Sequence, residues 1–390
     1  MIPSTLNVVL EGEFWRGTNG IVWGAGGFGD LYWRRYLDVF DRVVVVSRFA
    51  NGPPAHGAVA TSDPRVAFRS LPFYRGIAGF AAVLPRAWPH LRAAAAADGA
   101  FILRAPGGAC NLIGHLRSMA DRPFAVELVG DPSDVSAALS LGWAGELLRR
   151  VWTASTRTLT RRAAAVSYVT SQSLQHRYPA RADQPTFAIS SVVLNSNDFA
   201  HAPRRFARTT RPIRLLFVGA LHQLYKGPDV FIEAVAQLTT NGEAVEAVVV
   251  GDGAHRAALE ALADARGITT RVRFAGHLSR EDLFRELDAT DLFVLPSRTE
   301  GLPRALIEAM ARGLPCLGSR VGGIVELLEE RALLPVGQLS ALVTAISALS
   351  RSPDVMHDMA TRNLAVARTF SSEQLEPQRR TFYETVRRLA

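Results

Sequence analysis

Lysine and cysteine are both scarce in this 390-residue sequence, and each shortage has its own consequence. The two cysteines, Cys110 and Cys316, lie in opposite halves and form no CxxC pair, which excludes a disulfide framework and argues against a zinc site. A reducing, cytoplasmic compartment is therefore expected. The 44 basic side chains include one lysine, Lys226, and all the others are arginine. Either this ammonium survives by chance, or its point charge is required at that position.

Long apolar runs and dense basic tracts are missing as well. No uninterrupted run reaches the roughly 18 apolar residues that a membrane-spanning helix needs, and the first residues lack the pattern of a signal peptide, so neither is expected. The net charge of +8 is spread along the chain without a nucleic-acid-binding motif, so nucleic acid is not an expected partner, whereas a phosphate-bearing ligand stays open.

What the sequence does contain is a regular alternation of apolar strands and helical stretches. With 48% hydrophobic and 21% charged residues, the chain is a folded protein long enough for two domains. Continuous apolar runs such as 42–47, 214–219 and 292–297, separated by helix-like segments, predict two Rossmann-like, doubly wound α/β domains. The polar, proline-bracketed stretch 201–212 predicts the linker between them.

The predicted domains are an N-terminal Rossmann-like domain at 1–205 and a C-terminal Rossmann-like domain at 206–370. The amphipathic stretch 371–390 is expected to form a helix that packs back toward the first domain.

The segment with the most chemistry runs from 292 to 323, where a strand is followed by TEGLPRALIEAM. Glu300 falls on the loop after the strand, and Glu308 falls inside the following helix. Pro303 is expected at the first helical position, which leaves the amides of Gly301 and Leu302 free to bind an anion at the helix N-terminus. Taken singly, each glutamate could equally be surface charge.

Two more loops follow strands of the second half. Gly219 ends one strand, and Lys226 precedes a helix that begins near Pro228, an arrangement suited to a phosphate. Glycines 251 and 253 follow the next strand, where either a ligand approaches closely or the chain simply turns.

In combination, these segments resemble the retaining glycosyltransferases of the GT-B fold, in the large family 4 (glycosyl transferases group 1). The resemblance implies two Rossmann-like domains facing across a cleft, an acceptor-binding domain at 1–205 and a nucleotide-sugar-binding domain at 206–370. The resemblance rests on VGALHQLYKG, VVVGDG, RVRFAGHLS, the block LFVLPSRTEGLPRALIEAMARGLP with its two glutamates, and SRVGGIVELL, and it covers roughly 212–330. The first half matches more loosely, through VSYVTSQSL and VLNSNDF.

The resemblance implies a role for each matching residue. Lys226 would neutralise the donor diphosphate, and the amides of Gly301 and Leu302 would cap its distal phosphate. Glu300 would bind the transferred sugar, and Glu308 the ribose diol. The backbone at His277 and Leu278 would contact the base. A nucleotide-diphosphate sugar would be the substrate, with no cofactor and no metal.

The sequence departs from the family pattern at two places. An arginine that often follows the strand glycine is replaced by Ala220, and Arg298 or Arg304 is the expected substitute. A histidine near the donor sugar is also replaced, so Asp131 is predicted to make a catalytic polar contact, with His115 and Arg104 as weaker candidates.

Acceptor binding is assigned to the first domain, where Gly26, Gly27 and Phe28 belong to a glycine-rich loop. The alternative is that this loop is only a flexible turn. The expected activity is that of a glycosyltransferase (EC 2.4) moving a hexose-like unit from a UDP- or GDP-type donor to a small-molecule, glycan or lipid-linked acceptor. The alternatives are a nucleotide-sugar epimerase, a phosphorolytic enzyme and an inactive nucleotide-sugar-binding module.

The stretch ELLRRVWTASTRTLTRRA mixes arginines with apolar residues. It indicates either a solvated helix or a helix that makes peripheral contact with the inner membrane face.

Overall fold

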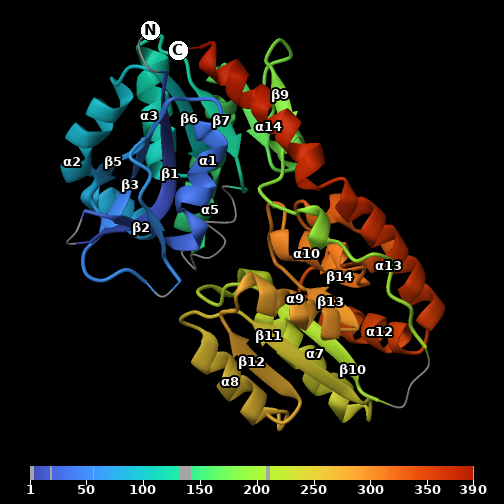
Figure 1. Cartoon of the computed structure of the whole chain (residues 1–390). Coiled ribbons are helices and arrows are strands. Elements are labelled where there is room, and N and C mark those ends of the chain that lie inside the picture. The colour runs from blue at the N-terminus through green and yellow to red at the C-terminus, as the bar shows by residue number, and fades with distance from the viewer. Residues whose placement is uncertain (1–3, 18–19, 56, 132–141, 208–210, 390) are drawn as a thin grey trace. The chain divides into compact units, whose positions relative to one another are not determined.

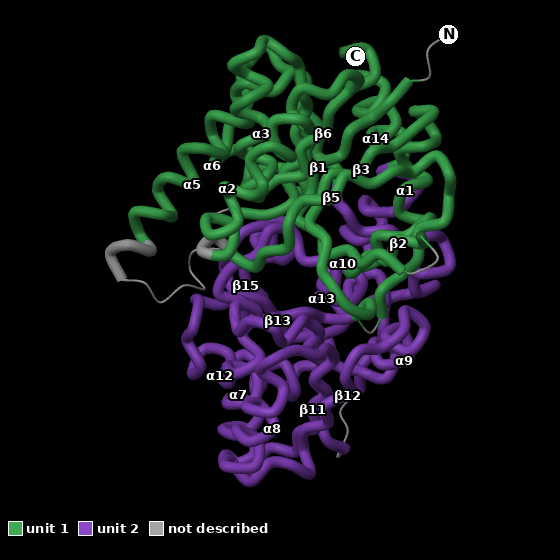
Figure 2. The backbone as a smooth tube through the Cα atoms, turned by 90° about the vertical axis from the view of Figure 1, so that its left-hand side faces the viewer, with its two compact units in different colours: residues 1–189, 376–390 green, residues 190–375 purple. Residues whose placement is uncertain are grey.

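The computed structural model describes residues 4–17, 20–55, 57–131, 142–207 and 211–389. The chain divides into two compact units (Figure 2). Unit 1 comprises residues 1–189 and 376–390, and unit 2 comprises residues 190–375. Among the described residues, no helix is long and apolar enough to cross a bilayer.

Unit 1 is built on a mostly parallel sheet that has nine strands among the described residues. Its central strand β1 (Thr5–Arg16) pairs in parallel with β3 (Arg42–Ala50) and β6 (Ala100–Ala105). The sheet continues through β5 (Val66–Leu71) on one side and β7 (Ala125–Leu128), β8 (Ala165–Tyr168) and β9 (Thr186–Ala188) on the other. Two short antiparallel strands, β2 (Val22–Gly24) and β4 (Val59–Thr61), extend from the end of β1.

Helices cover both faces of this sheet (Figure 1). One face carries α2 (Gly76–Ala95) and α3 (Gly108–Met119), with α5 (Gly142–Arg162) packed beside α3. The other face carries α1 (Asp30–Leu37) and the end of α14 (Ser372–Arg387). The short α6 (Ser173–Arg177) follows β8. Both faces are covered, so the β1 and β3 valines are buried whichever way they point, which is why those strands are continuously apolar.

The C-terminal helix is held to unit 1 by a buried carboxylate. The hydroxyl of Tyr383 on α14 donates to Glu127 of β7 at 3.2 Å, and the Tyr36 hydroxyl of α1 donates to the same group at 3.2 Å. Arg104 forms an ion pair with Glu127 at 2.7 Å. Arg104 is therefore committed to the interior of unit 1.

Unit 2 has a parallel six-stranded sheet in the order β12-β11-β10-β13-β14-β15 among the described residues. The strands are β10 (Ile213–Val218), β11 (Val245–Val250), β12 (Val272–Gly276), β13 (Leu292–Leu295), β14 (Cys316–Ser319) and β15 (Leu333–Leu334). The helices are α7 (Pro228–Thr240), α8 (Arg256–Ala265), α9 (Arg280–Ala289), α10 (Arg304–Ala311), α11 (Ile324–Leu327), α12 (Leu339–Ser350) and α13 (Pro353–Arg368). The prediction of two Rossmann-like domains is confirmed.

Unit 2 begins at Ser190, whereas the sequence places the boundary at 206. The intervening segment has no periodic pattern, but it packs on unit 2. The amide of Ser372 donates to Leu194 O at 2.7 Å, and the amide of Ala200 donates to Ala311 O at 2.8 Å. The Arg204 guanidinium donates to Asp288 O at 2.7 Å. These contacts are made between residues far apart in sequence, which is why composition alone does not locate them.

Candidate active site

The site predicted from the sequence lies at the carboxyl edge of the unit 2 sheet. Chain order reverses between β10 and β13, which are neighbours in the sheet: β11 and β12 extend from β10, whereas β14 and β15 extend from β13. Ligands of open parallel sheets bind at such a switch point. The loop after β10 carries Lys226, and the loop after β13 carries Glu300, so the two residues emerge side by side.

Two glycines fit the Lys226 loop against its neighbours. Gly227 has φ +73°, and a Cβ there would lie 2.1 Å from Pro296 O, so only glycine allows this turn into α7. A Cβ at Gly219 would lie 2.5 Å from the Cδ atom of Lys226. The predicted donor-site residue Gly219 therefore leaves the space that the lysine side chain occupies.

Lys226 and Glu300 form a largely buried ion pair, with Nζ 2.8 Å from Oε1. Their side chains are 15% and 7% exposed. Burial by itself lowers the pKa of Lys226, but the charge and hydrogen bond of Glu300 outweigh it, and the net shift of the pKa is upward. The fully buried Ser297 hydroxyl donates to the same Glu300 oxygen at 3.0 Å. Sequence reasoning did not single out Ser297, because a serine at a strand end carries no signal of its own.

The loop that leads into α10 presents free backbone donors. The helix begins at Arg304, one residue later than predicted, and Pro303 precedes it with φ −73° and ψ 111°. In the described part of the chain, the amides of Gly301 and Leu302 donate to no protein group. The loop is braced from behind, since the amide of Gly323 donates to Gly301 O at 2.7 Å. Free amides at a helix N-terminus suit an anion.

Glu308 lies in the second turn of α10, with its side chain 16% exposed. Burial raises its pKa, although the charges of Arg304 and Arg280 oppose the rise. Arg280 is 4.0 Å from the Glu308 carboxylate and is held by Asp198 at 2.8 Å and by Val193 O at 2.8 Å. Arg280 is a second residue that sequence reasoning missed, because its partners Val193 and Asp198 lie more than 80 positions earlier, just before the predicted linker.

The predicted base-binding residues follow β12. His277 is exposed and Leu278 is partly buried, and the next residue, Ser279, caps α9 by accepting from the amide of Asp282. The backbone at 277 and 278 thus lies between a strand end and a capped helix. This fixes its direction at the same edge of the sheet as Lys226.

The two arginines considered as substitutes for the missing basic residue at Ala220 differ in their environment. Arg298 is bound to Asp229 by contacts of 2.6 and 2.9 Å and also donates to Leu224 O at 2.6 Å. Arg304 is exposed and has no hydrogen bond or ion pair within the described ranges, and its charge acts on both Lys226 and Glu308. The free guanidinium is therefore that of Arg304.

In unit 1, the predicted catalytic residue Asp131 is buried and already engaged. Its two carboxylate oxygens accept from Arg177 at 2.5 Å and from the Tyr178 hydroxyl at 2.5 Å. These contacts tie the end of β7 to α6. The weaker candidate His115 is exposed on α3.

The predicted acceptor loop separates into two parts. Gly26 and Gly27 are exposed, with φ +67° and +87°. The Phe28 ring instead packs in the aromatic core, 4.8 Å from the Tyr32 ring and 5.9 Å from the Phe14 ring between centroids. Of the three predicted residues, Gly26 and Gly27 are exposed, whereas Phe28 is partly buried.

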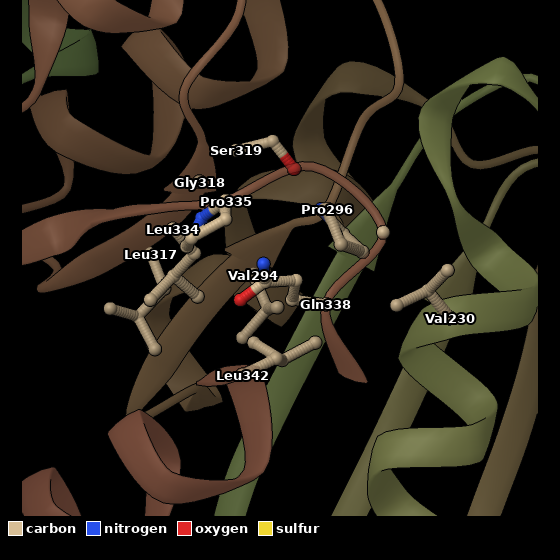
Figure 3. A pocket seen from close by; sticks show the side chains of 11 residues that line it. Val230, Val294, Pro296, Leu317, Gly318, Ser319, Leu334, Pro335, Gln338 and Leu342 are labelled. Atoms are coloured by element: carbon tan, nitrogen blue, oxygen red, sulfur yellow. The ribbon is translucent and has the colours of Figure 1, made fainter. Parts of the chain in front are cut away.

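A small pocket in unit 2 includes Pro296, the residue before Ser297, in its lining (Figure 3). It is lined mainly by apolar residues of β13, β14 and α12, among them Val294, Leu317 and Leu342. Its volume of about 10 Å³ is the space of about one water molecule. It is a packing gap and not a sugar site.

The second unit resembles known proteins in sequence. Residues 212–352 match the family model for glycosyl transferases group 1. Alpha-D-kanosaminyltransferase of Streptomyces kanamyceticus is 33% identical over 164 residues, covering 41% of this chain and 42% of that enzyme. Protein CapJ of Staphylococcus aureus is 23% identical over 362 residues, covering 90% of this chain and 88% of CapJ. The chain thus spans most of CapJ but less than half of the kanosaminyltransferase.

Among solved structures, Anabaena HepE in complex with UDP and glucose has a TM-score of 0.66 to this chain, at 19% identity, with 96% of this chain and 98% of that chain covered. Two Rossmann-like units of this kind make up the GT-B fold of these solved structures. The match of residues 212–352 relates the second unit in particular to the glycosyl transferases group 1.

Proposed function

We propose that this protein is a retaining, family 4 transferase that moves a sugar from a UDP- or GDP-type donor to an acceptor hydroxyl. The acceptor belongs to polysaccharide, glycolipid or specialised-metabolite synthesis. The observation that carries the proposal is the buried Lys226–Glu300 pair beside the free amides of Gly301 and Leu302. One small region thus offers a cation, an anion and a helix N-terminus, which a diphosphate joined to a polyol requires together.

The donor's diphosphate binds at the Gly301 and Leu302 amides, between the side chains of Lys226 and Arg304. Lys226 alone is insufficient, because Glu300 already neutralises it. Glu300 accepts from hydroxyls of the transferred sugar, since carboxylates accept two or more such bonds.

Glu308 accepts from the ribose diol, and the backbone at His277 and Leu278 meets the base. Acceptor binding falls to unit 1, where the exposed Gly26 and Gly27 are the proposed contacts. Two free buried thiols, Cys110 and Cys316, fit the reducing environment of the cytoplasm.

In the reaction, the bond between the anomeric carbon and the diphosphate oxygen breaks, and its electron pair stays on that oxygen. The acceptor oxygen bonds to the anomeric carbon on the same face, and its proton passes to the departing diphosphate. The developing negative charge is stabilised by Lys226, Arg304 and the α10 N-terminus, an electrostatic contribution that is commonly the largest in such sites. With these cations in place, no metal is assigned to the leaving group.

The test is transfer assayed with a panel of UDP- and GDP-sugars and candidate acceptors, with the anomeric configuration of the product read by NMR. A glycoside of retained configuration supports the proposal. Interconversion of donors without acceptor would identify an epimerase, and binding without any turnover would identify a binding module. The transferase names among the relatives favour transfer over both alternatives.

Arg304→Ala is expected to weaken UDP or GDP binding about tenfold, roughly 1.4 kcal/mol, because an unpaired guanidinium at the phosphate site is removed. Calorimetric titration measures the dissociation constant. The matched control is Arg298→Ala, which breaks the ion pair with Asp229. This variant should lower the melting temperature, and its loss of nucleotide affinity should be smaller than that of Arg304→Ala. A larger affinity loss for Arg298→Ala than for Arg304→Ala would reverse the assignment.

The donor KM is expected to rise at mildly acidic pH because of Glu308. Ribose hydroxyls donate to the ionised carboxylate, so donor binding needs Glu308 deprotonated. Burial raises its pKa above the ordinary 4.5, so the group takes up its proton at a higher pH than an exposed glutamate. KM measured from about pH 8 to about pH 5 should therefore climb as pH falls through the raised pKa. Glu308→Gln should have a high KM at every pH, without the rise at low pH. If KM of this variant still rises as pH falls, Glu308 is not the cause of the rise.

A further inference from the structure

The outward face of α5 carries an apolar stripe that remains exposed among the described residues of unit 1. Leu147 and Val151 are 55% and 57% exposed, and Ala154 and Thr158 are exposed as well. Their spacing of three and four residues places them on one side of the helix. Neighbouring turns thus present a continuous strip rather than scattered side chains.

Arginines flank this strip. Arg150, Arg157 and Arg161 are exposed along one edge at helical spacing. The single acidic residue of the helix, Glu146, is already paired with two arginines, at 2.5 Å and 3.0 Å. The face is therefore apolar at its centre and cationic at its border.

The helix α2 lies in the same layer as α5, because α3 packs against both helices (Figure 2). It also combines exposed arginines with an exposed apolar side chain. Its 20 residues include no aspartate or glutamate. Arg86 and Arg92 are exposed, and between them Trp88 keeps 39% of its surface exposed. Tryptophan beside arginine is typical of groups that sit at a membrane–water interface.

We propose that this surface, α2 together with α5, binds the anionic headgroups of a lipid bilayer. A solvated helix explains the arginines but not the exposed Leu147, Val151 and Trp88. A bilayer accounts for both, because apolar side chains enter the acyl boundary while guanidinium groups stay among the phosphates. The complementarity of charge favours an anionic leaflet over a neutral one.

Flotation of the full chain with vesicles tests the proposal without any donor or acceptor. The chain should float with vesicles of phosphatidylcholine and phosphatidylglycerol, float less as salt is raised, and stay unbound with phosphatidylcholine alone. The double variant Arg86→Gln, Arg161→Gln should lower the partition coefficient about 25-fold, taking about fivefold for each arginine near the surface. Leu147→Asp with Val151→Asp should also reduce binding, and circular dichroism checks that each variant is folded.

The matched control is Arg34→Gln with Arg380→Gln, two exposed arginines on the helices of the opposite face of the sheet. This control should bind like the unaltered chain. Equal losses for the two arginine pairs would show nonspecific attraction, and equal binding to neutral and anionic vesicles would remove the charge argument. Dimerisation that Leu147→Asp and Val151→Asp abolish, without vesicle binding, would make this face an interface between copies. Each of these results overturns the proposal.

Discussion

Lys226→Met should lower kcat/KM for the nucleotide sugar by roughly 10²- to 10³-fold, about 2.7 to 4 kcal/mol, because a preorganised cation facing the leaving group is lost. Methionine keeps most of the length of the chain and fills the space beside Gly219, so the effect is one of charge. Steady-state kinetics at a saturating acceptor concentration measure kcat/KM for the nucleotide sugar. UDP or GDP affinity should fall together with kcat, since the diphosphate carries its charge before and after transfer.

Lys226→Arg separates geometry from charge. The lysine side chain is 15% exposed and its Nζ already lies 2.8 Å from Glu300 Oε1, so a larger, planar guanidinium has little room at this position. We expect Lys226→Arg to recover less than a tenth of the lost activity. Melting temperatures of both variants show whether the fold persists without the buried ion pair. A Lys226→Met enzyme with near-normal kcat/KM would remove the lysine from the leaving-group site.

The sequence predicts those features that depend on local patterns. Continuous valine runs indicate parallel strands covered on both faces, and the spacing from Glu300 to Glu308 places one acid on a loop and the other in a helix. Gly227 followed by Pro228 marks the start of α7, because only glycine tolerates its positive φ and proline fits the first helical turn. Each of these inferences needs only neighbours in sequence.

The features that the sequence does not reveal depend on partners far along the chain. The engagement of Asp131 with Arg177 and Tyr178 joins residues more than forty positions apart. Phe28 follows two glycines and has the pattern of a loop residue, but tertiary packing draws its ring into the core. The Lys226–Glu300 contact spans 74 positions. Composition identifies Lys226 and the local motif identifies Glu300, but their ion pair depends on the order of the strands in the sheet.

That mutual neutralisation makes Glu300→Gln the most discriminating substitution. Glutamine keeps the shape and can still accept the Ser297 hydrogen bond, but it removes the negative charge 2.8 Å from the ammonium. We expect kcat to fall roughly 100-fold or more, because hydroxyls of the transferred sugar lose a charged acceptor in the transition state.

Binding of UDP or GDP alone should change in the opposite direction in Glu300→Gln. With Lys226 no longer neutralised, the diphosphate meets a full positive charge, and we expect roughly tenfold tighter binding by calorimetric titration. Lys226→Met should weaken the same binding. The two substitutions therefore change the nucleotide affinity in opposite directions, although both lower the rate of sugar transfer. A merely structural pair would shift both quantities in the same direction for both variants. Weaker nucleotide binding in Glu300→Gln would contradict these roles. It would show that the ion pair only stabilises the loop, and that Lys226 does not bind the diphosphate while Glu300 binds the sugar.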